Sequence, residues 1–386
     1  MVRTPGRSLV SSLRIGPAWI SSNITLHDDL KGIVSEFHDR AVPKCAIDAL
    51  EKLYGSVYAS FAHLNLTDAL PQLPTTWIGY EGGEIIAVLL FLVRFDQVVV
   101  LTELMCLEPR IVDAFRHAVL VRFDSVNSIH FNAVSLTQPL TAGPQQSYAF
   151  SENYIITLPH SVDLYRSALG KSTRKTIKGY SNRVQRDFSA FVWETYQANQ
   201  MPSHTLRALI RQLQNFKRDG LAARGKRAGL SRRDIARMLV LIKAGGLVGI
   251  ARVGERICGG SLACRVGDNY VMLFSAADPS MAAYRLGMLC CFWAVCDCIH
   301  AGARECHLLW GRYQYKTQLL AQPRTLLRLT IYRSWLQMCL SPLMVIGMSA
   351  TGARFRLRRW LLLKQHHEPW LSWLKKMSQR AASWLR

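Results

Sequence analysis

Two halves of the chain repeat the same order of apolar runs and turns. In the first half, apolar runs flank the turn at Gly83, and Pro109 precedes a helical stretch and a further strand. In the second half, Gly254 and Pro279 stand in the same order and at a nearly equal separation. Glycine turns between apolar runs are typical of β-hairpins, and a longer helical period follows in both halves. The sequence therefore predicts an α+β protein of two tandem lobes, each a mostly antiparallel mixed sheet flanked by helices. Chance similarity of two α+β halves is the alternative to a duplication.

The composition restricts the partners and the compartment. The chain has 386 residues, enough for two domains, and a formal net charge of +22 that attracts polyanions. Its ten cysteines include no C-x-x-C pair, so we expect buried, reduced thiols and no metal site. Arg3, Arg7 and Arg14 interrupt every short apolar stretch at the N-terminus, which disfavours a signal peptide. We therefore expect a cytoplasmic protein.

The last part of the chain differs from the two lobes. Ser334–Ala353 carries no charge and is long enough to span a membrane, but its polar residues, glycines and proline make a span the less favoured interpretation. From Arg354 onwards there are nine Lys or Arg, four of the ten tryptophans and one acidic residue. This pattern predicts an amphipathic helix at the inner face of an anionic membrane, with a disordered tail or an ordinary docking helix as the alternative. The expected boundaries are 1–158 for the N-terminal lobe, 159–334 for the C-terminal lobe and 335–386 for the basic helical tail.

A strand, a loop and a helix start make up the segment that is richest in chemistry. The apolar strand ends at Ser275, Asp278-Pro279 forms a loop, and a helix opens near Gly287. Free N–H groups at a helix start, beside a residue without a side chain, can bind a diphosphate. An ordinary turn is the competing interpretation. The residues that we predict to bind a cofactor phosphate here are Arg285, Leu286, Gly287 and Met288.

Three motifs in the second half carry a family resemblance. They are Leu164–Lys178, with its run of basic residues, Asp278–Gly287, and the strand followed by W-G-x-Y-x-Y-K at His307–Lys316. With them, residues 154–333 resemble the GNAT acyltransferase superfamily, in the branch named for the CelD/BcsL cellulose-biosynthesis proteins, which is related in architecture to FemAB-type transferases. The N-terminal lobe matches this fold only in outline.

The resemblance implies two GNAT-like lobes and acetyl-CoA, or another acyl-CoA, as co-substrate. The thioester would lie between diverging strands at Tyr270–Ser275 and Cys306–Trp310. The family's diphosphate motif is only partly present, because the spacing is compressed and its second glycine is absent. At the corresponding place, Leu107–Asp113 has no glycine and has acidic residues that would repel a diphosphate. We therefore expect the N-terminal lobe to shape the acceptor cleft without binding coenzyme A.

The same resemblance suggests catalytic and acceptor-binding residues. Tyr313 or Tyr315 would protonate the leaving thiolate, although an aromatic residue after a strand usually packs in the core. Asp278 would act as a base or bind the acceptor, although a turn residue before proline is the more common role. For binding the acceptor we predict Arg174, Trp310 and Lys316.

The leading hypothesis is transfer of an acyl group, with acetyl as the favoured group, to an amine or hydroxyl of a saccharide acceptor. That acceptor would be a sugar or polysaccharide precursor in bacterial envelope or exopolysaccharide synthesis. One alternative is FemAB-like aminoacyl transfer from charged tRNA. Another is a non-enzymatic nucleic-acid-binding protein, which is disfavoured because no aromatic stacking platform is interleaved with the basic residues. Basic stretches within 161–186 and 205–244 are either solvated helix faces or a wall that faces an anionic ligand.

Overall fold

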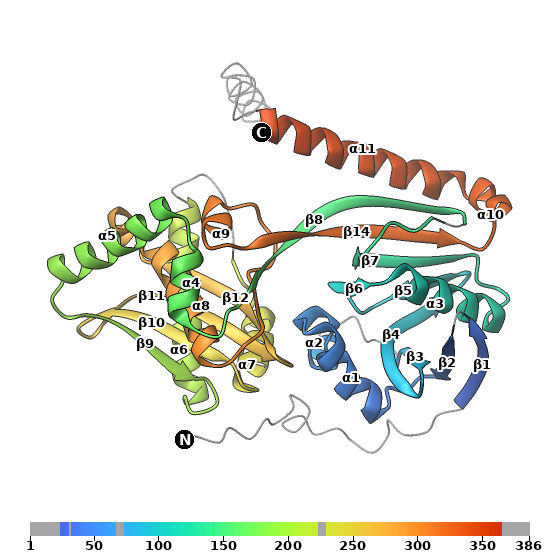
Figure 1. The fold of residues 1–386 in the computed structure, drawn as a ribbon, viewed down its shortest axis with the longest axis horizontal. Helices are drawn as coiled ribbons and strands as arrows, with labels where there is room; N and C mark the ends of the chain where they lie inside the picture. Colours follow the sequence, from blue (N-terminus) through green and yellow to red (C-terminus); the bar gives the residue numbers. More distant parts are fainter. Residues whose placement is uncertain (1–23, 31, 67–72, 142, 223–228, 365–386) are drawn as a thin grey trace.

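One sheet of 14 strands runs through the whole molecule (Figure 1). The structure is a computed structural model that describes residues 24–30, 32–66, 73–141, 143–222 and 229–364. The strand order is β1-β2-β3-β4-β5-β7-β14-β8-β13-β12-β11-β10-β9, and β6 pairs with β7. The strands are β1 (Ile24–Leu30), β2 (Ile33–His38), β3 (Thr75–Glu81), β4 (Glu84–Arg94), β5 (Gln97–Val100), β6 (Met105–Leu107), β7 (Ser128–Leu136), β8 (Gln145–Thr157), β9 (Phe191–Gln197), β10 (Leu247–Val253), β11 (Arg256–Val266), β12 (Asn269–Ala277), β13 (Glu305–His307) and β14 (Gln322–Tyr332).

The two halves have the same local topology, which confirms the predicted α+β class. In the first half, the antiparallel strands β2 to β5 lead through α3 (Pro109–Arg122) to β7, which pairs parallel with β5. In the second half, the antiparallel strands β10 to β12 lead through α8 (Leu286–His300) to β13, which pairs parallel with β12. The strand expected over Cys306–Trp310 is present as β13, which is shorter than predicted and ends at His307.

Strands β8 and β14 join the halves. β8 pairs with β13 at its C-terminal end and with β14 along most of its length, and β14 also pairs with β7. A strand from the end of the second half therefore lies inside the sheet of the first half (Figure 1). The boundary expected near residue 158 stays a prediction.

Helices cover both faces of each half. In the second half, Tyr165, Ile177 and the buried side of α8 form one core cluster, and Leu213 and Leu239 belong to another on the opposite face. In the first half, α3 packs on one face and α1 on the other. The remaining helices are α1 (Lys44–Tyr54), α2 (Phe61–Leu66), α4 (Val162–Ala168), α5 (Lys171–Asp187), α6 (Ser203–Ala222), α7 (Arg232–Lys243), α9 (Gln314–Gln318), α10 (Trp335–Leu340) and α11 (Pro342–Lys364), with the 3₁₀ turns η3 (Val57–Ala59) and η4 (Pro279–Tyr284).

The helix α11 lies along β8 at one side of the molecule (Figure 1). Within the described ranges, no helix combines the length and the apolar composition that crossing a bilayer requires. The rest of the predicted tail, residues 365–386, lies outside the described residues.

Candidate active site

The strands β12 and β13 separate after a short parallel contact. They pair only from Asn269–Val271 to Glu305–His307. Beyond His307 the chain stays with β8, since the Leu308 N–H donates to the Tyr154 carbonyl over 2.7 Å. The rest of β12 thus has an edge with no strand partner, and the predicted divergence of these two strands is present. Such an edge can offer backbone N–H groups to a carbonyl oxygen in the gap.

A β-bulge bends β12 at this gap. Leu262 pairs with Phe274, whereas the next residue of β11 pairs with Met272, so Leu273 is an extra residue in β12. A bulge re-aims the side chains that follow it. Here Phe274 belongs to the core on the α6 side, whereas the Ser275 hydroxyl accepts from the Cys291 thiol of α8 over 3.5 Å.

The start of α8 lies just after β12 and is open to a ligand. The first turn of a helix leaves its N–H groups without acceptors inside the helix, and this turn has no acidic residue. A β-carbon at Gly287 would meet only the Ala277 Cβ, at 4.0 Å, so packing within the protein does not require a glycine. Arg285 is the N-cap, with a φ of 49°, and its guanidinium lies 5.3 Å from the centre of the Tyr180 ring.

The four residues predicted to bind a cofactor phosphate are not equivalent. Arg285 and Gly287 are exposed, whereas Leu286 is buried in the core and Met288 is packed partly against it. Leu286 can therefore contribute its backbone N–H more readily than its side chain, whereas the Met288 N–H already donates to the Arg285 carbonyl over 2.9 Å.

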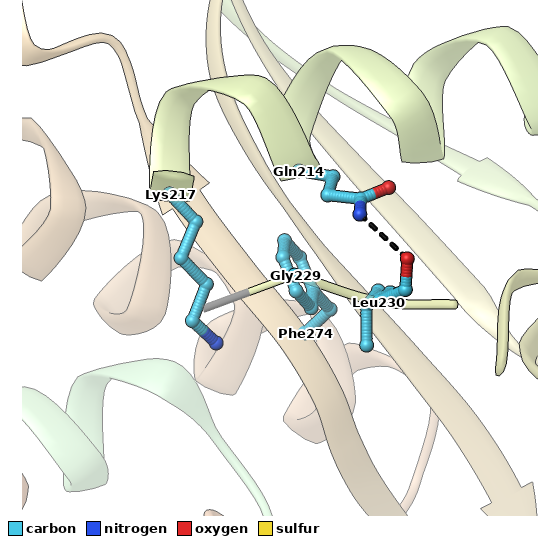
Figure 2. Close-up of a pocket in the computed structure, with 5 residues that line it drawn as sticks. All are labelled: Gln214, Lys217, Gly229, Leu230 and Phe274. Carbon is cyan, nitrogen blue, oxygen red and sulfur yellow. Dashed lines mark hydrogen bonds between the residues drawn. The ribbon is translucent and has the colours of Figure 1, made fainter. Parts of the chain in front are cut away.

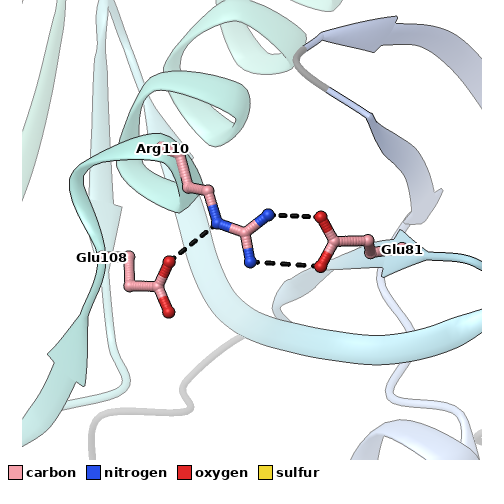
Figure 3. Close-up of polar contacts among 3 residues, drawn as sticks. All are labelled: Glu81, Glu108 and Arg110. Atoms are coloured by element: carbon pink, nitrogen blue, oxygen red, sulfur yellow. Dashed lines mark hydrogen bonds and ion pairs between the residues drawn. The ribbon is translucent and has the colours of Figure 1, made fainter.

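The corresponding helix start in the first half is filled by the protein's own charges (Figure 3). Glu108 is the N-cap of α3, and its carboxylate accepts from Arg110 Nε over 2.7 Å. The same guanidinium donates through its other nitrogens to both carboxylate oxygens of Glu81. Two carboxylates at this position disfavour an anionic ligand, in line with the prediction for this lobe.

Lys316 lies in the interior instead of facing a ligand. It is 2% exposed, and its ammonium donates to the carbonyls of Leu308, Leu309 and Trp310 over 2.8, 3.0 and 2.8 Å. An ammonium has three hydrogens, and these three carbonyls can use all of them. Lys316 therefore fixes residues 308–310, which follow β13 and diverge from β12. The structure gives its ammonium no free donor for the predicted contact with the acceptor. Burial lowers its pKa to about 8, which outweighs the opposite effect of Cys291.

The two candidate tyrosines stack beside the gap. The rings of Tyr313 and Tyr315 are 5.9 Å apart, but Tyr313 is exposed whereas Tyr315 packs partly against the core. Burial raises the pKa of Tyr315, and the charge of Cys291 and a hydrogen bond with it raise this pKa further. The Tyr315 phenol is therefore held in its protonated form.

The other predicted residues lie apart from Tyr315. Asp278 caps η4, accepting from the Ser280 N–H over 2.9 Å, and pairs with Arg256 over 2.5 Å. Burial acts to raise the pKa of Asp278, but these contacts outweigh it and the pKa is lowered. Its carboxylate is thus a weak base with partners already in place. The Trp310 ring lies 4.9 Å from the ring of Tyr58 in the N-terminal half, and Arg174 is exposed on α5.

A small cavity of about 70 Å³ opens on the α6 side of β12, at the bulge (Figure 2). Its lining includes Phe274, Gln214 and Lys217, and the Lys217 ammonium lies 4.3 Å from the centre of the Phe274 ring. No carboxylate of the described residues pairs with Lys217. The positive charge of Lys217 contributes to the lowered pKa of Lys316. Sequence reasoning placed Lys217 only within a basic stretch, because the pattern could not show that it faces Phe274.

Comparisons with known proteins identify one domain and one fold. Residues 171–317 match the family described as an acetyltransferase (GNAT) domain. No curated protein sequence gives a significant match. Among solved structures, FemX is 8% identical with a TM-score of 0.51, over 74% of this chain and 96% of FemX.

Two further structures are similar at lower scores. L-PGS from Bacillus licheniformis is 11% identical with a TM-score of 0.44, over 81% of this chain and 98% of that one. A tandem GNAT protein from the clavulanic acid biosynthesis pathway is 9% identical with a TM-score of 0.35, over 67% and 82%. Residues 171–317 are thus similar to the GNAT acetyltransferase domain, and the chain shares its fold with FemX.

Proposed function

We propose that the protein transfers an acyl group, with acetyl-CoA as the preferred donor, to an amine or hydroxyl of a sugar or polysaccharide precursor. The observation that carries the donor is the divergence of β12 from residues 308–310, with the start of α8 following β12 after the 3₁₀ turn η4. The thioester would lie along the free edge of β12, and the diphosphate would lie at the helix start beside Gly287 and Arg285. The CelD/BcsL branch and the saccharide acceptor rest on the sequence motifs alone.

The reaction needs few groups from the protein. The acceptor nitrogen or oxygen forms a bond to the thioester carbon, the carbon–sulfur bond breaks, the sulfur takes up a proton and the acceptor loses one. Backbone N–H groups at the free edge of β12 would stabilise the oxyanion, and Tyr315 would give its proton to the thiolate. Asp278 is the weaker part of this proposal, because its lowered pKa makes it a poor base.

The acceptor would enter from the cavity at the bulge. Its wall combines the Phe274 ring, the apolar Leu230 and the Lys217 ammonium. An aromatic ring beside an ammonium that pairs with no carboxylate of the described residues suits a sugar that carries a phosphate or carboxylate. Arg174 and Trp310 stay candidates for more distant contacts with a longer acceptor.

The test is acetyl-CoA binding, measured by calorimetry for the wild type, Gly287→Glu and Gly347→Glu. Gly287→Glu places a carboxylate against the diphosphate and should weaken binding at least about tenfold. Gly347→Glu adds the same charge on α11, where a β-carbon meets nothing within 4 Å, and should bind like the wild type. Equal binding by all three proteins would remove the α8 start as the cofactor site.

Aminoacyl transfer from charged tRNA is the second candidate function, since the fold likeness to FemX covers 74% of the chain. The same calorimetry separates the two candidates. A wild type that ignores acetyl-CoA but binds charged tRNA more tightly than uncharged tRNA would favour this alternative.

A further inference from the structure

The inner face of α11 is fixed to the sheet by specific contacts. The Gln146 side chain of β8 donates to the Val345 carbonyl over 3.3 Å and to the Ser349 hydroxyl over 3.1 Å. Further along the helix, the Phe355 ring stacks on Tyr148 with the ring centres 5.9 Å apart. Gly352 lies so close to Tyr148 that a β-carbon would come within 3.0 Å of it. These residues share one face of the helix, which therefore packs on β8.

The opposite face of α11 is apolar as well. Leu343, Ile346 and Leu357 point away from β8 at helical spacing, and all three are exposed. The short helix α10 adds three more exposed apolar side chains next to them. The exposed fractions of the six lie between 56% and 88%, for Trp335, Leu336, Leu340, Leu343, Ile346 and Leu357.

A helix that packs one stripe on a protein core normally shows polar residues on its outer side. Large apolar side chains that are exposed on two neighbouring helices are typical of a docking surface. We call these six side chains the outer apolar surface.

The charged residues of α10 and α11 are all positive. The sequence of 335–364 holds five Lys or Arg, all of them after Ala353, and no Asp or Glu. Among them, Arg354 and Arg356 are exposed in the second half of α11. A pair of helices with exposed Trp and Leu, basic residues towards one end and no acidic residue has the composition of helices that lie in the headgroup region of anionic bilayers.

A second copy of the chain fits this surface less well. A symmetric dimer places the same patch of each copy against the other, which would bring the basic residues of both copies together without any acidic partner. A phosphate-bearing lipid surface supplies the opposite charge and the apolar phase together.

We infer that α10 and α11 dock the protein on the surface of an anionic lipid bilayer, with both helices parallel to the membrane plane. The outer apolar surface would reach the boundary of the acyl chains, and Arg354 and Arg356 would lie at the lipid phosphates. Since α11 lies along β8 at one side of the molecule (Figure 1), a flat membrane can meet it without any unfolding.

The test is co-sedimentation of the full chain with vesicles rich in phosphatidylglycerol, compared with vesicles of phosphatidylcholine alone. The wild type should bind the anionic vesicles more tightly, and high salt should weaken this binding. Two variants test the apolar and the electrostatic contributions to binding separately. Leu336→Ser/Leu343→Ser/Ile346→Ser removes apolar area, and Arg354→Glu/Arg356→Glu reverses charge; each should weaken binding at least about tenfold.

Matched controls lie on other exposed helix surfaces. Leu164→Ser/Val121→Ser removes exposed apolar side chains from α4 and α3, and Lys44→Glu/Lys52→Glu reverses the same charge on α1, which lies far from α11 (Figure 1). Both control variants should retain most of the wild-type binding. Equal losses in test and control variants would show attraction by net charge alone and would overturn the proposal. A wild type that ignores anionic vesicles, or that forms a dimer which the triple serine variant dissolves, would also overturn it.

Discussion

At the scale of single residues, Lys316 shows how a charged side chain can shape a site without touching a ligand. Its ammonium donates to three successive carbonyls, from Leu308 to Trp310, just after β13, where this segment diverges from β12. These bonds fix the backbone of the segment on that side of the gap. The lysine of the W-G-x-Y-x-Y-K motif thus stabilises the backbone next to the proposed thioester site.

Replacing Lys316 with Met should lower the free energy of unfolding by about 2–4 kcal/mol, because buried carbonyls lose their donor. Lys175→Met, on the exposed face of α5, is the matched control and should change this free energy by less than about 0.5 kcal/mol. Urea denaturation measures both. A Lys316→Met protein as stable as the control would show that water replaces the ammonium without cost.

The pH dependence of the stability difference between the wild type and Lys316→Met gives a second readout of this prediction. The pKa of Lys316 is lowered from 10.5 to about 8 in the folded protein. Between these values the unfolded chain holds a proton that the folded protein has released, so stability rises with pH. The stability of the wild type relative to Lys316→Met should therefore increase from pH 8 towards pH 10.5 and stay constant below pH 8.

At the scale of helices and strands, local patterns predicted most of the elements. The hairpins around Gly83 and Gly254 and the helix that opens near Gly287 follow from periodicity and turn residues, and the structure contains them. The pairing of β14 with β7 and β8 was not predictable in the same way. It joins residues that are far apart in the chain, and no local pattern records which strand lies beside which.

In the candidate site, too, the residues in a local pattern could be predicted, whereas the long-range contacts could not. Gly287 and Arg285 could be proposed from the sequence because a helix start has a local pattern. The burial of Lys316 and the contact of Lys217 with Phe274 depend on elements that meet only in the folded chain.

Two glycines should respond in opposite ways to substitution by alanine. A β-carbon at Gly249 of β10 would lie 2.1 Å from the Trp193 ring of β9, whose indole donates to Asp297 of α8 over 3.0 Å. Gly249→Ala should therefore displace this ring and cost about 1–3 kcal/mol. Gly179 lies inside α5 with nothing near its β-carbon, and Gly179→Ala should stabilise by up to about 1 kcal/mol. Thermal denaturation of both variants measures the two changes in Tm. If both variants shifted Tm in the same direction, the environments assigned to Gly249 and Gly179 would be wrong.

At the scale of the whole molecule, the continuous sheet makes the halves depend on each other. β14 completes the sheet of the first half although it follows the GNAT domain in the chain, and β8 leads from that sheet to β13 at the gap. A substitution that destabilises the core of one half should therefore also lower the stability of the other half, unlike in two domains that are joined only by a linker.

Leu329→Ala in β14 and Ile250→Ala in β10 test this coupling. Both side chains are buried, Leu329 in the core of the first half and Ile250 in that of the second, and each change should cost about 2–5 kcal/mol. Native-state hydrogen exchange, read by mass spectrometry, would follow peptides from β4 and from β12. If the sheet opens as one unit, either variant lowers protection equally in both peptides. If Leu329→Ala affects only β4 and Ile250→Ala only β12, the lobes are separate cooperative units, and the pairing of β8 and β14 then holds them together without coupling their stability.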